Sequence, residues 1–151
     1  IPDILKSFEN GSSVIVRNPQ ATRPWQHVLE PLSGYLVLVQ KLYQNPKEYA
    51  EGWNFGPNEQ DVKPVDWILD KMVSKWPNSS WELDKSSSPH EAGFLKLDIS
   101  KAKSKLGWNP LWSLNDTLEK IVNWHQAWLN KEDMQTICLK EIEEYTKDMN
   151  K

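Results

Sequence analysis

The sequence RNPQATRPWQHV, residues 17–28, connects two segments of different character. Before it, Ser13–Val16 is rich in β-branched residues and predicts a short strand. After it, the apolar side chains of residues 30–43 follow the helical period and predict a helix. Pro19 and Pro24 favour extended backbone in the residues that precede them. The stretch is therefore predicted to be a polar connection between a strand and a helix.

Both arginines of the chain, Arg17 and Arg23, lie in this connection, and the other basic residues are lysines. A guanidinium is a planar fork of N–H donors that keeps its charge, so it suits bidentate binding of phosphate or carboxylate. The pair therefore predicts an anion site. Composition alone leaves open an alternative, in which the arginines only cover the ring of Trp25 on the surface.

Composition limits the classes of function. The chain has 151 residues, enough for one domain with its own core. A net charge of -3 with both signs interspersed argues against a nucleic-acid surface. The mean hydropathy of -0.68, without a long apolar run, argues against a membrane span. We therefore expect neither nucleic acid nor membrane as a partner.

The single cysteine, Cys138, excludes an internal disulfide and a cysteine-rich metal site. We expect a buried apolar thiol, no bound metal and a cytoplasmic location. The chain opens with IPDILKSFEN, which has neither an initiator methionine nor a signal peptide. This segment is predicted to be helical from its first residues. This beginning predicts a piece of a longer protein.

Periodicity and turn residues predict the remaining elements. Helices are expected over residues 2–9, 64–76, 98–106, 113–129 and 134–149, and short strands over residues 26–28, 52–56, 80–83 and 94–97. Two boundaries have specific signals: Ser113 with Asp116 resembles a capping box, and Gly107 suits a helix end. Without regular βαβ alternation, this order predicts a small mixed α+β domain.

Nine tryptophans are spread along the chain. Flat exposed indole rings would suit a sugar-binding platform. Most of these tryptophans fall at helix-periodic positions or strand ends, so we expect the majority to pack in the core.

The usual catalytic motifs are missing: there is no glycine-rich phosphate loop, HExxH, CxxC or GxSxG. His125, on a helix with tryptophans, is predicted to be a half-buried packing residue. His90 and Glu91 lie in the loop SSSPHEAG. A carboxylate beside an anion site can hydrogen-bond a ribose diol, as in nucleotide sites. A solvated loop glutamate is the alternative.

Three stretches together carry a family resemblance. They are R-x-W-x-H-V at Arg23–Val28, W-N-F-G-P-N at residues 53–58, and D-x-S-K-A-x-x-x-L-G-W-x-P at residues 98–110. Nearly the whole chain resembles the C-terminal part of the extended short-chain dehydrogenase/reductases, and among them the nucleotide-sugar 4,6-dehydratases. The wording RNPxAxRPWQHVLEP at residues 17–31 resembles members that act on CDP-glucose rather than on dTDP-glucose or GDP-mannose.

The resemblance implies a two-part enzyme. An N-terminal Rossmann domain would hold NAD(H) and a catalytic Tyr-x-x-x-Lys pair, and a smaller C-terminal domain, residues 1–151 here, would bind the nucleotide sugar. In that family, hydride leaves sugar C4 for NAD, water is lost across C5 and C6, and the hydride returns to C6. We expect no catalytic and no NAD-binding residues in this chain.

The resemblance also implies roles at matching positions. Arg23 would contact the diphosphate, and Glu91, preceded by His90, the ribose. Val14 and Val16 fall where the family has a strand beside the base. Many relatives have a second phosphate arginine shortly before the acidic position, where this chain has Lys85 and serines. Arg17 is the candidate for supplying that charge.

The predicted function is therefore substrate binding within a cytoplasmic, homo-oligomeric CDP-glucose 4,6-dehydratase that feeds deoxysugar synthesis for surface polysaccharide such as lipopolysaccharide O-antigen. Two alternatives stay open. One is a related epimerase or dehydratase acting on a dTDP-, GDP- or UDP-sugar. The other is a stand-alone carbohydrate-binding module that uses the tryptophans.

Overall fold

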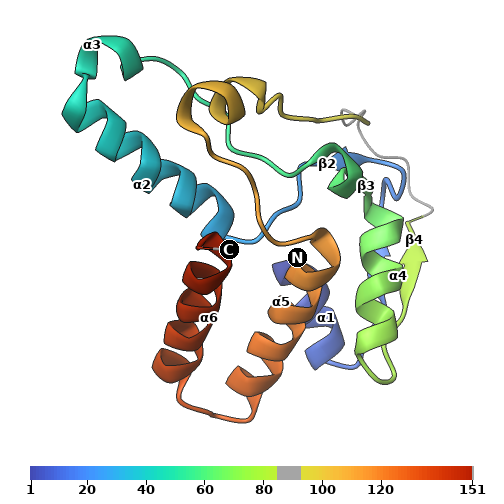
Figure 1. Cartoon of the computed structure of the whole chain (residues 1–151). Helices are drawn as coiled ribbons and strands as arrows, with labels where there is room; N and C mark the ends of the chain where they lie inside the picture. The colour runs from blue at the N-terminus through green and yellow to red at the C-terminus, as the bar shows by residue number, and fades with distance from the viewer. Residues whose placement is uncertain (85–92, 151) are drawn as a thin grey trace.

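The computed structural model describes residues 1–84 and 93–150 (Figure 1). The described helices are α1 (Pro2–Glu9), α2 (Leu29–Gln44), α3 (Pro46–Tyr49), α4 (Val65–Lys75), α5 (Leu114–Leu129) and α6 (Met134–Met149), with a 3₁₀ turn at Glu59–Asp61 and a π-helical turn at Ala102–Leu106. The described strands are β1 (Val14–Val16), β2 (Thr22–Arg23), β3 (Lys63–Pro64) and β4 (Trp81–Leu83).

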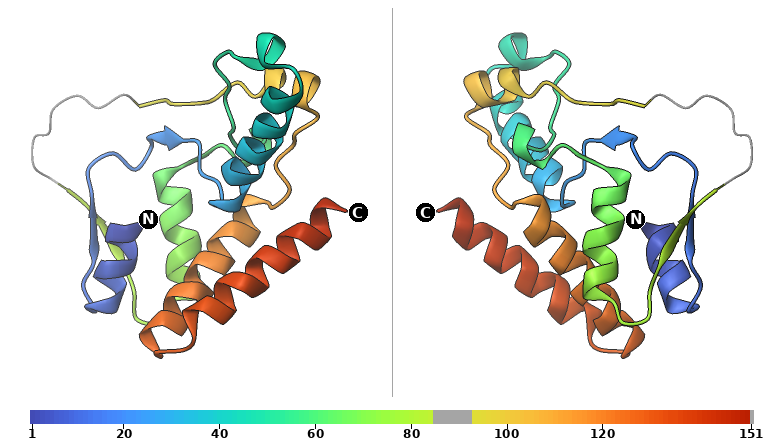
Figure 2. Two further views of the ribbon diagram at one scale, coloured as in Figure 1. Left: turned by 90° about the vertical axis from the view of Figure 1, so that its left-hand side faces the viewer. Right: turned by 90° about the vertical axis from the view of Figure 1, so that its right-hand side faces the viewer.

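The described strands form two separate pairs. β1 and β4 are parallel, with Val14 opposite Trp81 and Val16 opposite Leu83. β2 and β3 are antiparallel, with Arg23 opposite Lys63. Helix α4 lies between the β1–β4 pair and α5, and α6 runs beside α5 (Figure 2). The predicted mixed α+β architecture is confirmed.

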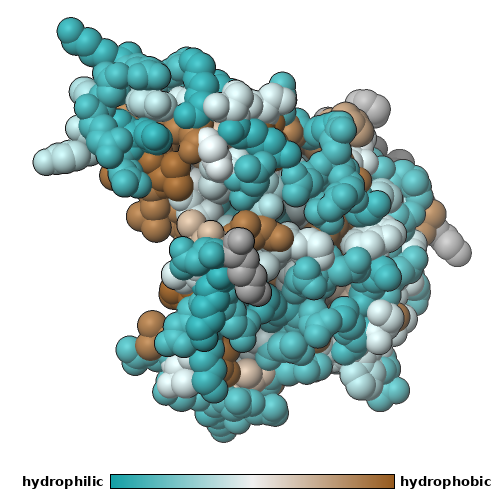
Figure 3. Space-filling view, in the orientation of Figure 1, coloured by the Kyte–Doolittle hydropathy of each residue, from teal (hydrophilic) through white to brown (hydrophobic). Residues whose placement is uncertain are grey.

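Helix α2 leaves most of its apolar side chains uncovered. The predicted helix over residues 30–43 is confirmed with slightly wider bounds. Its periodic apolar residues are nevertheless exposed: Leu32, Tyr35, Leu36, Val39 and Tyr43. Figure 3 shows hydrophobic side chains gathered over α2 in the upper left of the molecule. The periodicity therefore predicted the helix but not which side of it is buried.

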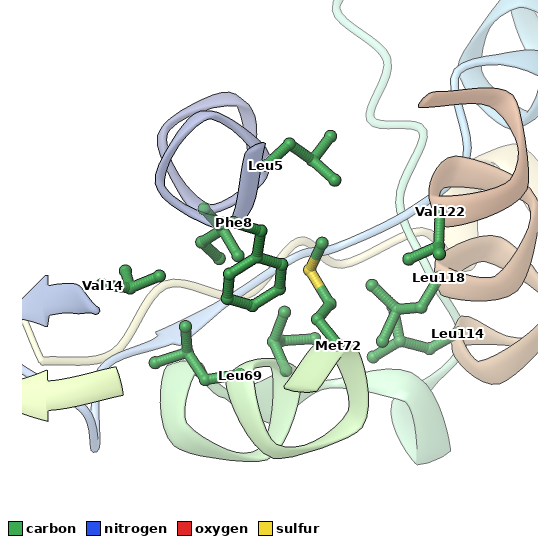
Figure 4. Packing of buried hydrophobic residues seen from close by; sticks show 10 residues of the cluster. Leu5, Phe8, Val14, Leu69, Met72, Leu114, Leu118 and Val122 are labelled. Atoms are coloured by element: carbon green, nitrogen blue, oxygen red, sulfur yellow. The ribbon is translucent and has the colours of Figure 1, made fainter. Parts of the chain in front are cut away.

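The main core lies between α1, β1, α4 and α5 (Figure 4). Helix α4 is its centre, because Ile68, Leu69 and Met72 recur at helical spacing and are fully buried. Leu114 and Leu118 of α5 approach them from the other side. Burying an aliphatic side chain of this size stabilises a fold by about 1.5–3 kcal/mol.

A second, smaller core lies beneath α2. It contains Phe55 and Trp108, whose rings meet edge to face with 5.0 Å between their centres. The Phe55 ring lies so close to the α2 backbone that a Cβ on Gly34 would come within 2.2 Å of it. Glycine at this position therefore permits the close approach of α2 to the 53–58 segment.

The tryptophans mainly support these two cores. Six of the nine belong to the cores or pack against them: Trp25, Trp53, Trp67, Trp76, Trp81 and Trp108. Trp108 is buried, whereas Trp128, at 47% exposure, is the most open of the set. The prediction that most tryptophans pack in the core is confirmed, although most are only half-buried.

Three predicted strands are wrong. Residues 26–28 and 52–56 are irregular, and the segment 94–97 contributes only one isolated bridge, from Phe94 to Thr22. These segments are connected by side chains instead: the Gln26 amide donates to the Phe55 carbonyl at 2.9 Å, and the Asn54 amide to the Asp98 carbonyl at 3.2 Å. Extended sequence character therefore did not produce a ladder in these segments: beside β2, the backbone after Gly93 bonds to Thr22 alone within the described residues.

The predicted helix boundaries with local signals are confirmed. Ser113 and Asp116 form a complete capping box at the start of α5. Gly107 ends the helical segment before it in the left-handed region, with φ of 69°. Asp98 accepts a hydrogen bond from the N–H of Ser100 at 2.8 Å, at the beginning of that segment.

A buried carboxylate joins α2 to two distant parts of the chain. Glu30, fully buried, accepts the N–H groups of Leu111 and Trp112 at 3.0 and 2.8 Å and the hydroxyl of Tyr145 at 2.7 Å. Burial raises the pKa of Tyr145, so its hydroxyl keeps the proton that it donates. Ser33 accepts the indole N–H of Trp108 at 2.9 Å in the same network.

Replacing Glu30 by glutamine should test this network. The amide nitrogen is a donor, so at least one of the N–H or O–H groups that Glu30 accepts would meet another donor. We expect a loss of about 1–3 kcal/mol in the free energy of unfolding. Urea denaturation of Glu30→Gln and of the matched control Glu143→Gln, an exposed position on α6, measures it. Equal stability of the two variants would contradict a structural role for the carboxylate.

Candidate anion-binding site

The first arginine follows the parallel strand pair directly. β1 ends at Val16, whose carbonyl accepts the N–H of Asp84 at 2.8 Å, just beyond the end of β4. Arg17 is the next residue and is exposed. Two segments far apart in the sequence therefore meet at the beginning of the arginine stretch.

The turn between the arginines is bonded to the beginning of α4. The N–H of Ala21 donates to the carbonyl of Asn18 at 3.2 Å and closes the turn. The N–H groups of Val65 and Asp66 donate to the carbonyls of Ala21 and Pro19 at 3.0 and 2.9 Å. The first N–H groups of a helix have no partner within it, so the turn caps α4 and is itself held in place.

Thr22, the residue before Arg23, is fixed on two sides. It lies opposite Pro64 in the β2–β3 pair. On its other side, its N–H donates to the carbonyl of Gly93 at 2.8 Å and its carbonyl accepts the N–H of Leu95 at 3.0 Å. The described residues on both sides of the interval 85–92 are therefore bonded to the arginine stretch, Asp84 at one end and Gly93 at the other.

Arg23 and Lys63 are two basic residues at facing positions of a strand pair. They lie directly opposite in the antiparallel β2–β3 pair, where facing residues project from the same side of the ribbon. Both side chains are half-buried. The guanidinium of Arg23 donates to the carbonyl of Thr22 at 2.9 Å, and the ammonium of Lys63 lies 5.8 Å from the centre of the Trp67 ring. An anion at this side of the ribbon would meet two basic residues.

Sequence reasoning missed Lys63. The strand that carries it is two residues long, and no motif in the sequence marks the lysine. Its place opposite Arg23 follows only from the register of two segments about forty residues apart, Thr22–Arg23 and Lys63–Pro64. Only the pairing of β2 with β3 could have revealed it.

The other predicted site residues lie at different depths. Val14 belongs to the main core and Val16 packs against it, while Ile15 between them is exposed. A ligand at this strand would therefore meet the Ile15 side chain or the backbone before the valine side chains. His90, Glu91 and Lys85 lie outside the described residues, so their roles stay predictions.

His27 faces the interior rather than the arginines. Its Nδ1 accepts the N–H of Leu29 at 3.3 Å, and its ring meets the ring of Trp112 edge-on, with 4.8 Å between centres. Burial, with a smaller contribution from the charge of Lys120, lowers the pKa of His27 to about 4. The imidazole is therefore neutral at pH 7 and adds no positive charge to the site.

Tyr43 and Lys47 stand in a Tyr-x-x-x-Lys spacing, the spacing of the catalytic pair that the family resemblance implies for the N-terminal domain. On one helix, such residues would share a face. Here Asn45, with φ of -146°, interrupts the helix, so Tyr43 ends α2 and Lys47 belongs to α3. Tyr43 is also 91% exposed, and no described element organises the two residues into a site.

Within residues 1–84 and 93–150, no cluster of three or more histidine, cysteine, aspartate or glutamate side chains is arranged to hold a metal ion. The helices in this part of the chain include none with the length and apolar character needed to cross a bilayer. The described site is thus a cationic surface without a metal cluster.

The chain is similar to known enzymes that act on nucleotide sugars. It is 56% identical over 146 residues to a CDP-glucose 4,6-dehydratase of Salmonella typhimurium, which covers 96% of this chain and 41% of that enzyme. It is 23% identical over 130 residues to UDP-glucuronic acid decarboxylase 1 of Xenopus tropicalis, covering 82% of the chain and 29% of that protein. The Arabidopsis thaliana protein of the same name is 22% identical over 121 residues, covering 80% of the chain and 26% of that protein.

No family model matches the chain. The chain spans about two-fifths of the length of the Salmonella enzyme and under a third of the two decarboxylases. The resemblance to the nucleotide-sugar 4,6-dehydratases is confirmed by the identity to the Salmonella enzyme over nearly the whole chain.

The lowered pKa of His27 predicts a pH dependence of stability. Between pH 6.5 and about pH 4, the unfolded chain binds a proton at His27 that the folded chain does not, so stability falls as the pH falls through this window. The difference between the pKa values of His27 in the unfolded and the folded chain corresponds to about 3 kcal/mol in the free energy of unfolding. Burial raises the pKa of Glu141, 3.9 Å from His27, which acts in the opposite direction and reduces the net loss.

Urea unfolding at about pH 7 and about pH 4.5 measures this dependence in the unsubstituted chain and in His27→Asn. Asparagine keeps an acceptor near the position of Nδ1 but does not titrate. We expect the variant to lose less stability on acidification than the unsubstituted chain. Equal losses in both would show that His27 does not titrate in this window.

Proposed function

We propose that the chain is the nucleotide-sugar-binding part of a CDP-glucose 4,6-dehydratase. The observation that carries the proposal is the 56% identity to the Salmonella enzyme over 146 residues. The chain spans 41% of that enzyme, and we assign the NAD-dependent chemistry to the part that the chain does not span. We place the NAD-binding Rossmann domain in that N-terminal part.

The arrangement of charges supports a diphosphate as the anion. Arg23 and Lys63 face each other across β2 and β3, and the exposed Arg17 stands at the other end of a turn that is bonded to α4. A diphosphate carries enough negative charge to offset both facing cations and offers several acceptor oxygens to the guanidinium fork. We assign the main diphosphate contact to Arg23 and a second one to Lys63 or Arg17.

The ends of the interval 85–92 support a ribose contact from the same site. Asp84 is bonded to Val16 and Gly93 to Thr22, so the described residues on either side of the segment that contains His90 and Glu91 lie beside the two arginines. We propose that Glu91 accepts hydrogen bonds from the ribose hydroxyls, with His90 beside it. A carboxylate serves this role in other nucleotide sites.

NAD would supply the hydride acceptor and donor for the dehydration when it is bound to the rest of the enzyme. The role of this chain is to bind the nucleotide, so that the sugar extends towards the NAD-binding part of the enzyme. Fixed positioning of a reactant can contribute a large fraction of catalysis without any chemical group acting on the sugar. The chain alone is therefore proposed to bind but not to convert CDP-glucose.

The alternatives differ in ligand. The two UDP-glucuronic acid decarboxylases share only 22–23% identity with the chain, so a UDP-sugar is the weaker candidate. A stand-alone carbohydrate module would need flat exposed indole rings, and six of the nine tryptophans belong to or pack against the cores. The structure therefore favours nucleotide over free sugar as the recognised group.

Calorimetry on the chain should separate these ligands. We expect CDP and CDP-glucose to bind weakly and free glucose not measurably, because charge-assisted bonds to phosphate contribute more than exchanged hydroxyl bonds. With NAD and CDP-glucose present, no 4-keto product should form. Tight binding of free glucose, or turnover by the chain alone, would contradict the proposal.

Substituting Arg23 by lysine in the full-length enzyme tests the assigned contact. The charge is kept, but the planar fork is lost, so a bidentate grip becomes at best a single contact. We expect a loss of about 1.5–3 kcal/mol, or roughly one to two orders of magnitude in affinity for CDP-glucose. The melting temperature should shift by no more than about 2–4 °C.

Arg17→Lys is the matched variant at the other end of the turn. A smaller loss would make Arg17 a secondary contact, and an equal loss would make it the second phosphate ligand. Normal affinity in Arg23→Lys, or a melting temperature far below that of the parent, would show that Arg23 has a structural role instead.

A further inference from the structure

Helix α2 is apolar almost all round. Its inward side, with Val37 and Leu38, packs against the second core. Its other side exposes Leu36 at 72% and Val39 at 61%. From Pro31 to Gln40 the helix carries no charged residue. A helix that is hydrophobic on every side is normally buried on every side, and this one is covered on one side only within the described residues.

The exposed side of α2 continues into hollows against α6. One hollow of about 440 Å³ lies between the two helices and is lined mainly by apolar side chains, among them Leu32, Leu36, Ile142 and Met149. A second, of about 340 Å³, adjoins it at Leu29 and Ile142. Together they extend the patch that Figure 3 shows over α2. Contiguous apolar surface of this kind marks an interface.

The length of the related enzyme indicates what covers this surface. The Salmonella dehydratase is 56% identical to the chain, and the chain spans only 41% of it. Well over half of that enzyme therefore lies outside the matched part and needs a surface on that part to contact. We infer that the exposed face of α2, defined by Leu32, Tyr35, Leu36, Val39 and Tyr43, is the surface on which the remaining part of the same polypeptide docks. This inference rests on the proposed function.

Docking at this face would have a consequence for substrate binding. α2 begins six residues after Arg23, and its first turn is fixed by Glu30 to the 111–112 segment and to α6. A partner seated on α2 would therefore be placed at a set distance from the diphosphate site. The same helix would join the nucleotide-binding part of this chain to the part that carries out the chemistry.

Thiol accessibility tests the inference directly. Leu36→Cys is introduced into the chain and into the full-length enzyme, and the rate of alkylation at position 36 is followed by peptide mass spectrometry, which separates it from Cys138. We expect alkylation at least about tenfold slower in the full-length enzyme, because only a local opening would expose the thiol. Trp128→Cys, at an exposed site at the end of α5, is the control and should react at similar rates in both.

Dilution distinguishes the occupant. Protection by the same polypeptide is independent of concentration, whereas protection by a second copy is lost on dilution by about a hundredfold. Equal reactivity of position 36 in both proteins, or protection that disappears on dilution or appears in the concentrated chain alone, would overturn the inference. Affinity for CDP-glucose is measured separately, so failure of docking and failure of the proposed function give different results.

Discussion

The buried carboxylate of Glu30 determines how the pieces of this fold meet. Removing a carboxylate from water costs several kcal/mol unless its oxygens are well hydrogen-bonded. Here two backbone N–H groups and the Tyr145 hydroxyl satisfy them, and these donors come from residues 111–112 and from α6. The first turn of α2 is therefore attached to parts of the chain more than eighty residues away. Because α2 follows the arginine stretch, this attachment also fixes one end of that stretch.

The proposed anion site is organised differently from the Glu30 network. The carboxylate of Glu30 is fully buried among its donors, whereas the side chains of Arg23 and Lys63, at facing positions of the β2–β3 pair, are only half-buried. A nucleotide diphosphate would interact favourably with both basic groups. The ribbon that carries them is short, and hydrogen bonds to the beginning of α4 and to Gly93 fix its position.

Features with local causes were predictable from the sequence, and those with distant causes were not. The capping box at Ser113 and the left-handed Gly107 each depend on a few neighbouring residues, and both are confirmed. β2 and β3 have two residues each and exist only because Thr22 and Arg23 meet Pro64 and Lys63. The two arginines lie in one short stretch and were recognisable in the sequence. Lys63 lies about forty residues further on, and only the register of β2 with β3 places it opposite Arg23.

Helix α2 shows a further limit of periodicity. Leu32, Leu36 and Val39 recur at helical spacing, and this correctly predicted a helix. Yet Val37 and Leu38, on the other side, are the residues that contact the second core. When both sides of a helix are apolar, the pattern says that both need a partner but cannot say which partner each side has. Within the described residues, Phe55 and Trp108 cover the inward side. We therefore infer that the uncovered side meets the remaining part of the same polypeptide, on the helix that the buried Glu30 holds next to the proposed diphosphate site.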